Sequence, residues 1–184
     1  MPRQVNDRKG IRSCDPPRSL ERPLPIRDVR RIHAPRALGE RLRGLAFAKV
    51  FTSPLQRAVR TCELAGFGAV AEIGPDLVEW DYGQYEGRRT AEIHAERPDW
   101  QLFRDGCPAR ADRVVGRVRA IKGDVLVFSS GHFLRVFAAR WLGLDAAGGR
   151  YLLLSTASLS ALGYEHNLTE PAIRLWNETR HVET

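Results

Sequence analysis

The sequence predicts an α/β protein, a three-layer α/β/α sandwich with a largely parallel central sheet. The first observation behind this prediction is a pair of strand–turn–helix units, over residues 48–64 and 124–142. The second is the almost continuous apolar run within residues 124–129, which is typical of a strand covered on both faces. With 184 residues, 43% of them hydrophobic and 28% charged, the chain fits one globular domain.

The first 36 residues differ in composition from the rest of the chain. They contain six prolines, and their few apolar residues follow neither a period of 2 nor one of 3.6. We expect residues 1–36 to be disordered and residues 37–184 to form the domain. The opening segment holds ten basic residues against four acidic ones, a net charge of +6 out of +7 for the chain. Because the remainder is nearly neutral, nucleic-acid binding through the basic tail ranks last among the functions considered.

The first strand–turn–helix unit follows residues 37–45, which have the pattern of the end of an amphipathic helix. Residues 48–52 form a short apolar run typical of a buried strand, and residues 55–64 have helical spacing. Between them, Ser53 is suited to cap the helix and Pro54 to occupy its first position. The later pattern predicts strands at residues 69–73, 124–129, 158–166 and 172–177, and helices at residues 90–96, 109–121 and 131–142.

Several classes of protein are excluded by composition. The three cysteines, Cys14, Cys62 and Cys107, are widely spaced, so the sequence predicts neither a disulfide framework nor a zinc site. No apolar run reaches the roughly 18 to 20 residues that span a bilayer, and charges stand where a signal peptide would be apolar. We therefore expect a soluble cytoplasmic protein that needs no metal or other cofactor.

Polar side chains follow both strands of the strand–turn–helix units. Ser53 and Arg57 come after the first strand, and Ser129, Ser130 and His132 come after the second. Ligands bind at the carboxyl ends of parallel strands, and helix N-termini attract anions. The sequence therefore predicts a phosphate site at this edge of the sheet.

Three ordered motifs resemble those of the histidine phosphatase (phosphoglycerate-mutase-like) superfamily. They are Ser53-Pro-Leu-Gln-Arg57-Ala-Val-Arg-Thr61, Glu79-Trp-Asp-Tyr-Gly-Gln-Tyr-Glu-Gly87 and Ser129-Ser-Gly-His132. The resemblance covers about the last four fifths of the chain. It implies a phosphoglycerate-mutase-like fold and hydrolysis of phosphomonoesters through a phosphohistidine, without a metal. The wording of the second motif is most similar to the sugar-phosphatase branch that acts on sedoheptulose bisphosphate, which implies a small sugar phosphate as substrate.

The resemblance also implies roles for individual residues. Arg57 matches the arginine that clamps phosphate, with Ser53 beside it, and His132 matches the second histidine that stabilises the phosphoryl group. Glu79 matches the proton donor, and Glu86 is the rival acid. The alternatives are a surface arginine, a structural histidine and an exposed loop glutamate. The same resemblance leaves Arg60, His94, His166 and His181 in structural or solvated roles.

The aromatic residues of the second motif have two readings. Trp80, Tyr82 and Tyr85 either shape the substrate entrance or belong to the core. The sequence does not favour one reading over the other, and it gives no indication of the oligomeric state.

The chain departs from the family at its N-terminus. The apolar strand ending in Arg-His-Gly, which carries the nucleophile at the centre of the sheet, is absent, and a shorter loop follows Cys107. His33 is the only histidine before Ser53, but its neighbour Pro35 predicts an extended or turning segment, so we do not assign it as nucleophile. We expect a missing first central strand and impaired activity. A shifted reading frame before Ala37 and a non-catalytic phosphate-binding pseudoenzyme are the two explanations.

Overall fold

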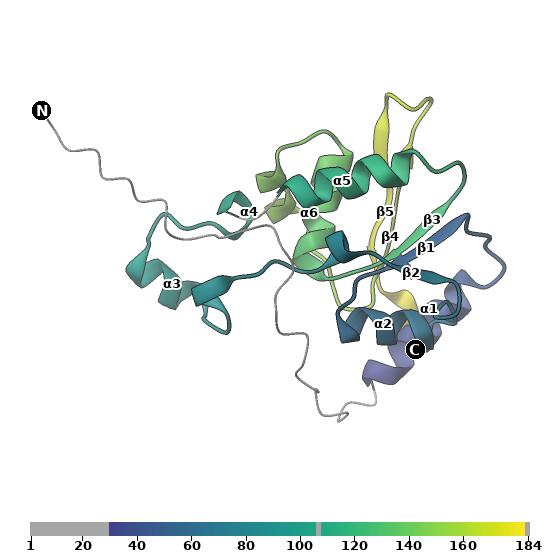
Figure 1. Cartoon of the computed structure of the whole chain (residues 1–184), viewed down its shortest axis with the longest axis horizontal. Helices are drawn as coiled ribbons and strands as arrows, with labels where there is room; N and C mark the ends of the chain where they lie inside the picture. The colour runs from purple at the N-terminus through teal and green to yellow at the C-terminus, as the bar shows by residue number, and fades with distance from the viewer. Residues whose placement is uncertain (1–29, 106–107, 183–184) are drawn as a thin grey trace, which may run out of the picture.

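The central sheet has three parallel strands in the order β2-β1-β3 (Figure 1). The computed structural model describes residues 30–105 and 108–182. In it, β1 (Lys49–Thr52) pairs with β2 (Ala71–Ile73) on one side and with β3 (Val125–Phe128) on the other. Two strands that lie far apart in the sequence therefore end side by side, and the predicted α/β class is confirmed.

Helices cover both faces of this sheet. Phe51 of β1 and Val127 of β3 pack into one apolar cluster with α5 (Pro108–Arg119) and α6 (Gly131–Trp141). Val50 and Leu126 point to the opposite face and pack with α1 (Arg30–Leu42) and α2 (Gln56–Leu64). The result is the three-layer arrangement predicted from the sequence, with α5 and α6 above the sheet in Figure 1 and α1 and α2 below it.

A separate antiparallel hairpin packs into the apolar clusters on both faces of the central sheet. Its strands are β4 (Leu159–Tyr164) and β5 (Pro171–Glu178). Leu162 packs into the cluster under α5 and α6, and Leu159 packs into the other. Among the described residues, β3 has β1 as its only strand neighbour, so the two sheets are not joined by backbone hydrogen bonds. Because residues 1–29 lie outside the described residues, the absence of the first central strand stays a prediction.

The start of the domain differs from the prediction. Helix α1 begins at Arg30, so the segment around His33 is helical and not extended, although Pro35 lies inside it. Residues 1–29, and with them most of the basic tail, lie outside the described residues. Proline removes one helical hydrogen bond, but burial of an apolar face offsets that loss. That face consists of Ala34, Leu38 and Leu42, spaced four residues apart.

The other elements lie close to their predicted positions. The predicted helices over residues 90–96 and 109–121 are present as α3 (Thr90–Glu96) and α5. No helix among the described residues combines the length and apolarity that crossing a bilayer requires. The remaining elements are the short helix α4 (Leu102–Asp105) and the 3-10 turns η1 (Pro75–Leu77), η2 (Gly83–Tyr85), η3 (Ala146–Tyr151) and η4 (Arg180–Val182).

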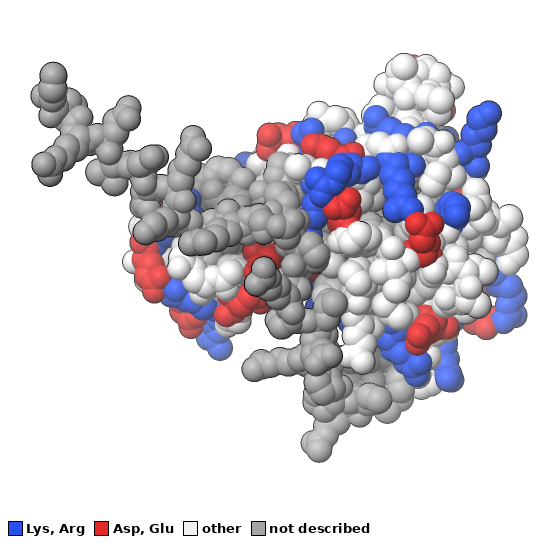
Figure 2. All heavy atoms as spheres, in the orientation of Figure 1, with Lys and Arg blue, Asp and Glu red and all other residues white. Residues whose placement is uncertain are grey.

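Basic and acidic side chains are interspersed on the face shown in Figure 2. Among the described residues, ion pairs also join separate elements, such as Arg140 of α6 with Asp112 of α5, whose Nε and Oδ1 atoms lie 2.6 Å apart. This mixture agrees with the nearly neutral composition that the sequence gives for residues 37–184. Exposed pairs of this kind contribute at most about 1 kcal/mol each to stability.

Candidate functional site

Ser53 stands at the point where β1 ends and the turn into α2 begins. Its side chain is fully buried, and its hydroxyl accepts a hydrogen bond from the Leu55 amide at 3.2 Å. The helix itself starts at Gln56 with Leu55 as its N-cap, two residues later than the predicted cap. Ser53 thus shapes the turn that presents Arg57, while its predicted contact with phosphate stays a prediction.

Arg57 joins the two strand–turn–helix units. It lies in the first turn of α2, and its Nη2 and Nε atoms donate to the Ser130 hydroxyl at 2.8 and 3.2 Å. Ser130 is buried and forms the N-cap of α6, two residues before His132. The parallel pairing of β1 with β3 brings about this contact between residues 73 positions apart.

Glu79 is not an exposed loop glutamate. Its side chain is only 13% exposed, and its carboxylate lies at the N-terminus of α6. One oxygen accepts from the amides of Phe133 at 2.9 Å and Trp80 at 3.2 Å, and the other accepts from the amide of His132 at 3.1 Å. A negative charge is favoured at a helix N-terminus, where backbone N–H groups lack helical partners. Glu79 therefore caps α6 directly beside the predicted site histidine.

His132 lies in the first turn of α6 with its ring partly exposed. Its Nδ1 atom is 2.6 Å from the Tyr82 hydroxyl and 3.9 Å from a carboxylate oxygen of Glu79. The edge of its ring meets Phe103 at a centroid distance of 5.6 Å. Burial lowers the pKa of His132, and Arg135 lowers it further, while Glu79 acts in the opposite direction. The imidazole is accordingly neutral around pH 7.

The aromatic residues of the second motif divide between the two readings. Trp80 is a core residue, 5% exposed and packed edge-to-face against Phe133. Tyr85 is half-buried against Trp100, at a centroid distance of 5.6 Å. Of the three side chains, that of Tyr82 is hydrogen-bonded to a predicted site residue, His132. Its pKa is raised by burial, and the nearby charges of Glu79 and Glu86 add to the effect.

Sequence reasoning missed Arg110, which lies behind the site. It is 2% exposed, its Nη2 donates to the carbonyl oxygen of Glu79 at 3.2 Å, and its guanidinium lies over the Trp80 ring. Burial lowers the pKa of Arg110. The sequence does hold a signal for this residue, because Arg110 lies one turn before Val114 on the apolar face of α5. An arginine at a core position needs a hydrogen-bonding partner. Phe103 had no comparable signal.

The residues that the resemblance left aside lie elsewhere. Arg60 is exposed on α2 and pairs with Glu63 at 3.1 Å, and the rival acid Glu86 is exposed and accepts from the Tyr82 amide. His33 is exposed on α1. The other histidines bond outside the site: His94 to the carbonyl of Trp100, His166 to Glu170, and His181 to Glu178 and the carbonyl of Ala157.

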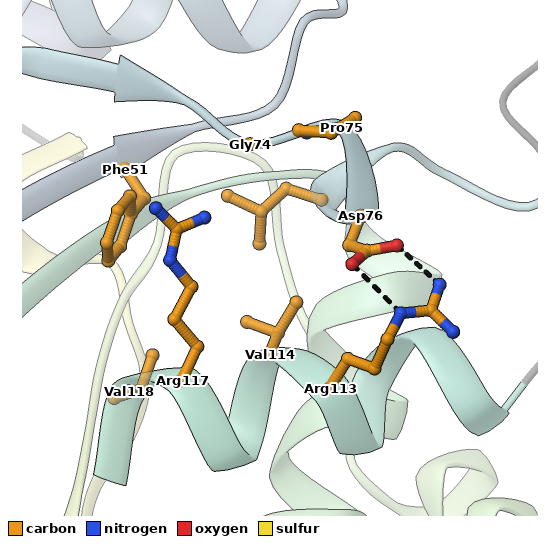
Figure 3. A pocket seen from close by; sticks show the side chains of 9 residues that line it. Phe51, Gly74, Pro75, Asp76, Arg113, Val114, Arg117 and Val118 are labelled. Atoms are coloured by element: carbon orange, nitrogen blue, oxygen red, sulfur yellow. Dashed lines mark hydrogen bonds and ion pairs between the residues drawn. The ribbon is translucent and has the colours of Figure 1, made fainter. Parts of the chain in front are cut away.

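A small hollow of ≈ 90 Å³ lies between β1, η1 and α5 (Figure 3), and none of the predicted site residues lines it. Asp76 accepts two hydrogen bonds from Arg113 across it, at 2.5 and 3.0 Å. Arg117 stacks over the Phe51 ring at 4.3 Å and pairs with Glu72. Because both arginines are already paired, these contacts fasten α5 to the sheet and leave no free charge for a ligand. The described residues also contain no cluster of three or more potential metal ligands.

The arrangement favours an anionic ligand. Arg57 contributes a permanent cation from α2, and His132 contributes a neutral donor from α6, at the carboxyl ends of neighbouring parallel strands. Glu79 adds a carboxyl group within 3.9 Å of the imidazole. A cation, a hydrogen-bond donor and an acid at one strand edge are the groups that phosphoryl chemistry uses.

Comparisons with known proteins agree with this geometry. Residues 32–179 match the family model described as "Histidine phosphatase superfamily (branch 1)". An acid phosphatase of Mycobacterium tuberculosis is 38% identical over 135 residues, which are 67% of this chain and 66% of that protein. A sedoheptulose 1,7-bisphosphatase of Saccharomyces cerevisiae is 35% identical over 130 residues, covering 52% of this chain and 48% of that protein. The chain thus spans two thirds or less of these relatives.

Solved structures show the same fold. The product of a Mycobacterium tuberculosis open reading frame superposes with a TM-score of 0.73 at 34% identity, over 81% of this chain and 82% of that one. The α-ribazole phosphatase of Shigella flexneri superposes with a TM-score of 0.68, over 83% of this chain and 84% of that one. At 22% identity, this second likeness supports the fold alone.

Proposed function

Because this chain belongs to the histidine phosphatase superfamily, we propose that Arg57 and His132 bind the phosphate group of small phosphomonoesters, sugar phosphates in particular. The observation that carries the proposal is the pair of hydrogen bonds from Arg57 to Ser130, the residue that caps the helix of His132. That contact supports the proposal because it joins the two strand–turn–helix units that carry the guanidinium and the imidazole. The 35% identity with a sedoheptulose 1,7-bisphosphatase supports a sugar phosphate as the ligand.

Each residue has a distinct role in this proposal. The planar guanidinium of Arg57 suits bidentate contact with phosphate oxygens, and His132 donates a hydrogen bond to the same group. Glu79 is the group that protonates the leaving group in this proposal, and for this step the carboxylate must first take up a proton. Ser53 holds the turn that presents Arg57.

We further propose that hydrolysis by this chain is impaired. All five histidines of the chain lie within the described residues, and four of them are exposed or bonded away from Arg57. His132 is the second histidine of the motif, not its nucleophile. Loss of a covalent nucleophile lowers kcat by orders of magnitude while leaving binding groups in place. A phosphate-binding protein without turnover is the alternative function that this observation favours.

The test measures binding and turnover separately. Isothermal titration with inorganic phosphate is compared between the wild type, Arg57→Gln and His132→Ala, with Arg60→Gln as the matched control on the same helix. We expect Arg57→Gln to weaken binding by roughly 10- to 100-fold, the value of a charge-assisted pair of hydrogen bonds, and Arg60→Gln to leave it unchanged. An equal loss of phosphate affinity in Arg57→Gln and Arg60→Gln, or no phosphate binding by a folded wild type, would overturn the proposed site.

Turnover is measured with a panel of sugar phosphates and a chromogenic phosphomonoester. Binding without turnover supports the impaired or non-catalytic function. Turnover that His132→Ala abolishes shows that the chain retains a working nucleophile, and it refutes the proposed impairment while supporting the site.

A further inference from the structure

The hydroxyl of Tyr82 makes the shortest contact of the His132 ring. The two residues lie 50 positions apart, yet the hydroxyl oxygen is 2.6 Å from Nδ1, and the two rings meet edge-to-face with centroids 6.1 Å apart. Phe103 closes another side of the imidazole. Nδ1 is thus engaged inside the protein, and Nε2, which has no hydrogen-bond partner among the described residues, is the ring nitrogen that remains for a ligand.

We propose that Tyr82 is a positioning residue whose hydroxyl donates a hydrogen bond to Nδ1 of His132. This bond holds the neutral imidazole as the Nε2–H tautomer. This inference rests on the proposed role of His132 as a donor to phosphate. A neutral imidazole has one N–H donor and one acceptor nitrogen, so the partner of one nitrogen fixes the other. With Nδ1 accepting from Tyr82, Nε2 carries the hydrogen that a phosphate oxygen needs.

The charges around the pair favour this direction of donation. Burial beside Glu79 and Glu86 raises the pKa of Tyr82, so the phenol keeps its proton throughout the neutral range. Burial lowers the pKa of His132, which favours the neutral imidazole, and one of the two nitrogens of a neutral imidazole is an acceptor. The charged groups that face the pair are Glu79 from the η1–η2 segment, Glu86 directly after η2, Arg135 from α6 and Arg57 from α2. Arg135 favours a neutral imidazole, and Glu79 acts in the opposite direction.

The competing arrangement has the proton on Nδ1. His132 would then donate to the Tyr82 oxygen or, with a small ring movement, to Glu79 at its present 3.9 Å. In that tautomer Nε2 carries a lone pair, which repels a phosphate oxygen. The two arrangements therefore predict opposite effects of the Tyr82 hydroxyl on phosphate binding.

The experiment records nitrogen chemical shifts of 15N-histidine-labelled protein in phosphate-free buffer, with His132→Asn to assign the His132 signals. We expect a pyridine-type Nδ1 and a pyrrole-type Nε2 in the wild type. Tyr82→Phe removes the donor to the neutral ring, so we expect mixed tautomers and a higher pKa of His132. Tyr85→Phe is the matched control, because Tyr85 packs against Trp100 and not against His132.

Phosphate titration of the same proteins completes the test. We expect Tyr82→Phe to weaken phosphate binding by about three- to tenfold, the range of one hydrogen bond. Its midpoint of thermal unfolding should equal that of the Tyr85→Phe control. A pyrrole-type Nδ1 in the wild type, or a tautomer and pKa unchanged by Tyr82→Phe, overturns the inference. A wild type with the expected tautomer but no phosphate affinity supports the positioning by Tyr82 and refutes the proposed function.

Discussion

Replacement of Glu79 by glutamine is expected to lower stability and to strengthen phosphate binding. The carboxylate accepts from three backbone amides, at 2.9, 3.1 and 3.2 Å, with both oxygens in use. A glutamine keeps one acceptor oxygen. In place of the other oxygen it has an NH2 group, which cannot accept a hydrogen bond from the backbone amides that this oxygen binds in the wild type. A buried donor left without an acceptor costs about 1–3 kcal/mol, and the lost charge at the α6 N-terminus costs about 0.3–1 kcal/mol.

We therefore expect Glu79→Gln to reduce the free energy of unfolding by about 2 kcal/mol, which is roughly 4–8 °C in the thermal midpoint for a domain of this size. Phosphate affinity changes in the opposite direction, because the negative charge beside His132 is removed. An increase of up to about tenfold is expected for screened charges near a protein surface.

Urea titration and thermal unfolding measure the first effect, and calorimetric titration with inorganic phosphate measures the second. Glu86→Gln is the control, since Glu86 is an exposed acid of the same segment that accepts from one amide only. If Glu79→Gln and Glu86→Gln unfold at the same midpoint, Glu79 does not cap α6 as described. A weaker affinity for phosphate in Glu79→Gln would show that the anion does not bind beside this carboxylate.

Three further predictions concern the rest of the domain. Leu38→Ala removes a side chain of α1 that is 5% exposed, and we expect it to reduce the free energy of unfolding by about 2–4 kcal/mol in urea titration. A loss below about 0.5 kcal/mol, the size expected of a surface substitution, would show that α1 does not pack against the core. Hydrogen bonds from Arg180 and His181 lower the pKa of Glu178 from 4.5 to about 2. The stability that this carboxylate contributes is therefore complete above pH 4.5 and is lost as the pH falls toward 2, so the thermal unfolding midpoint of Glu178→Gln should depend less on pH in that window than the midpoint of the wild type. Burial raises the pKa of Cys62 to about 11, so site-resolved mass spectrometry should find it alkylated at pH 8 only under unfolding conditions, and rapid reaction in the native protein would contradict its burial.

The two strand–turn–helix units could be predicted because local pattern and tertiary environment agree in them. The apolar run before Ser129 is a strand, and the helix after Gly131 ends one residue from its predicted end. The same agreement holds for β1 and α2, apart from the cap at Leu55. The fold of these units follows from short-range signals that their burial reinforces.

Helix α1 could not be predicted at its full length, for a physical reason. Its N-terminal half contains Pro35, which argues locally against a helix, and packing of Leu38 and Leu42 on the sheet outweighs this local signal. The site was predictable in its residue types but not in its contacts. The motif located Glu79, yet nothing local reveals that its oxygens cap a helix 53 residues later.

Ligand binding and chemistry are separable in this architecture. Arg57 and His132 depend on the pairing of β1 with β3, which the described chain contains in full register from Lys49 to Thr52. A nucleophile from a further central strand would stand at the other edge of β3, where the described residues supply no strand. The proposed binding groups are therefore held by contacts that do not involve a further central strand. Under the proposed function, a chain without that strand binds phosphate through Arg57 and His132 but does not hydrolyse the ester.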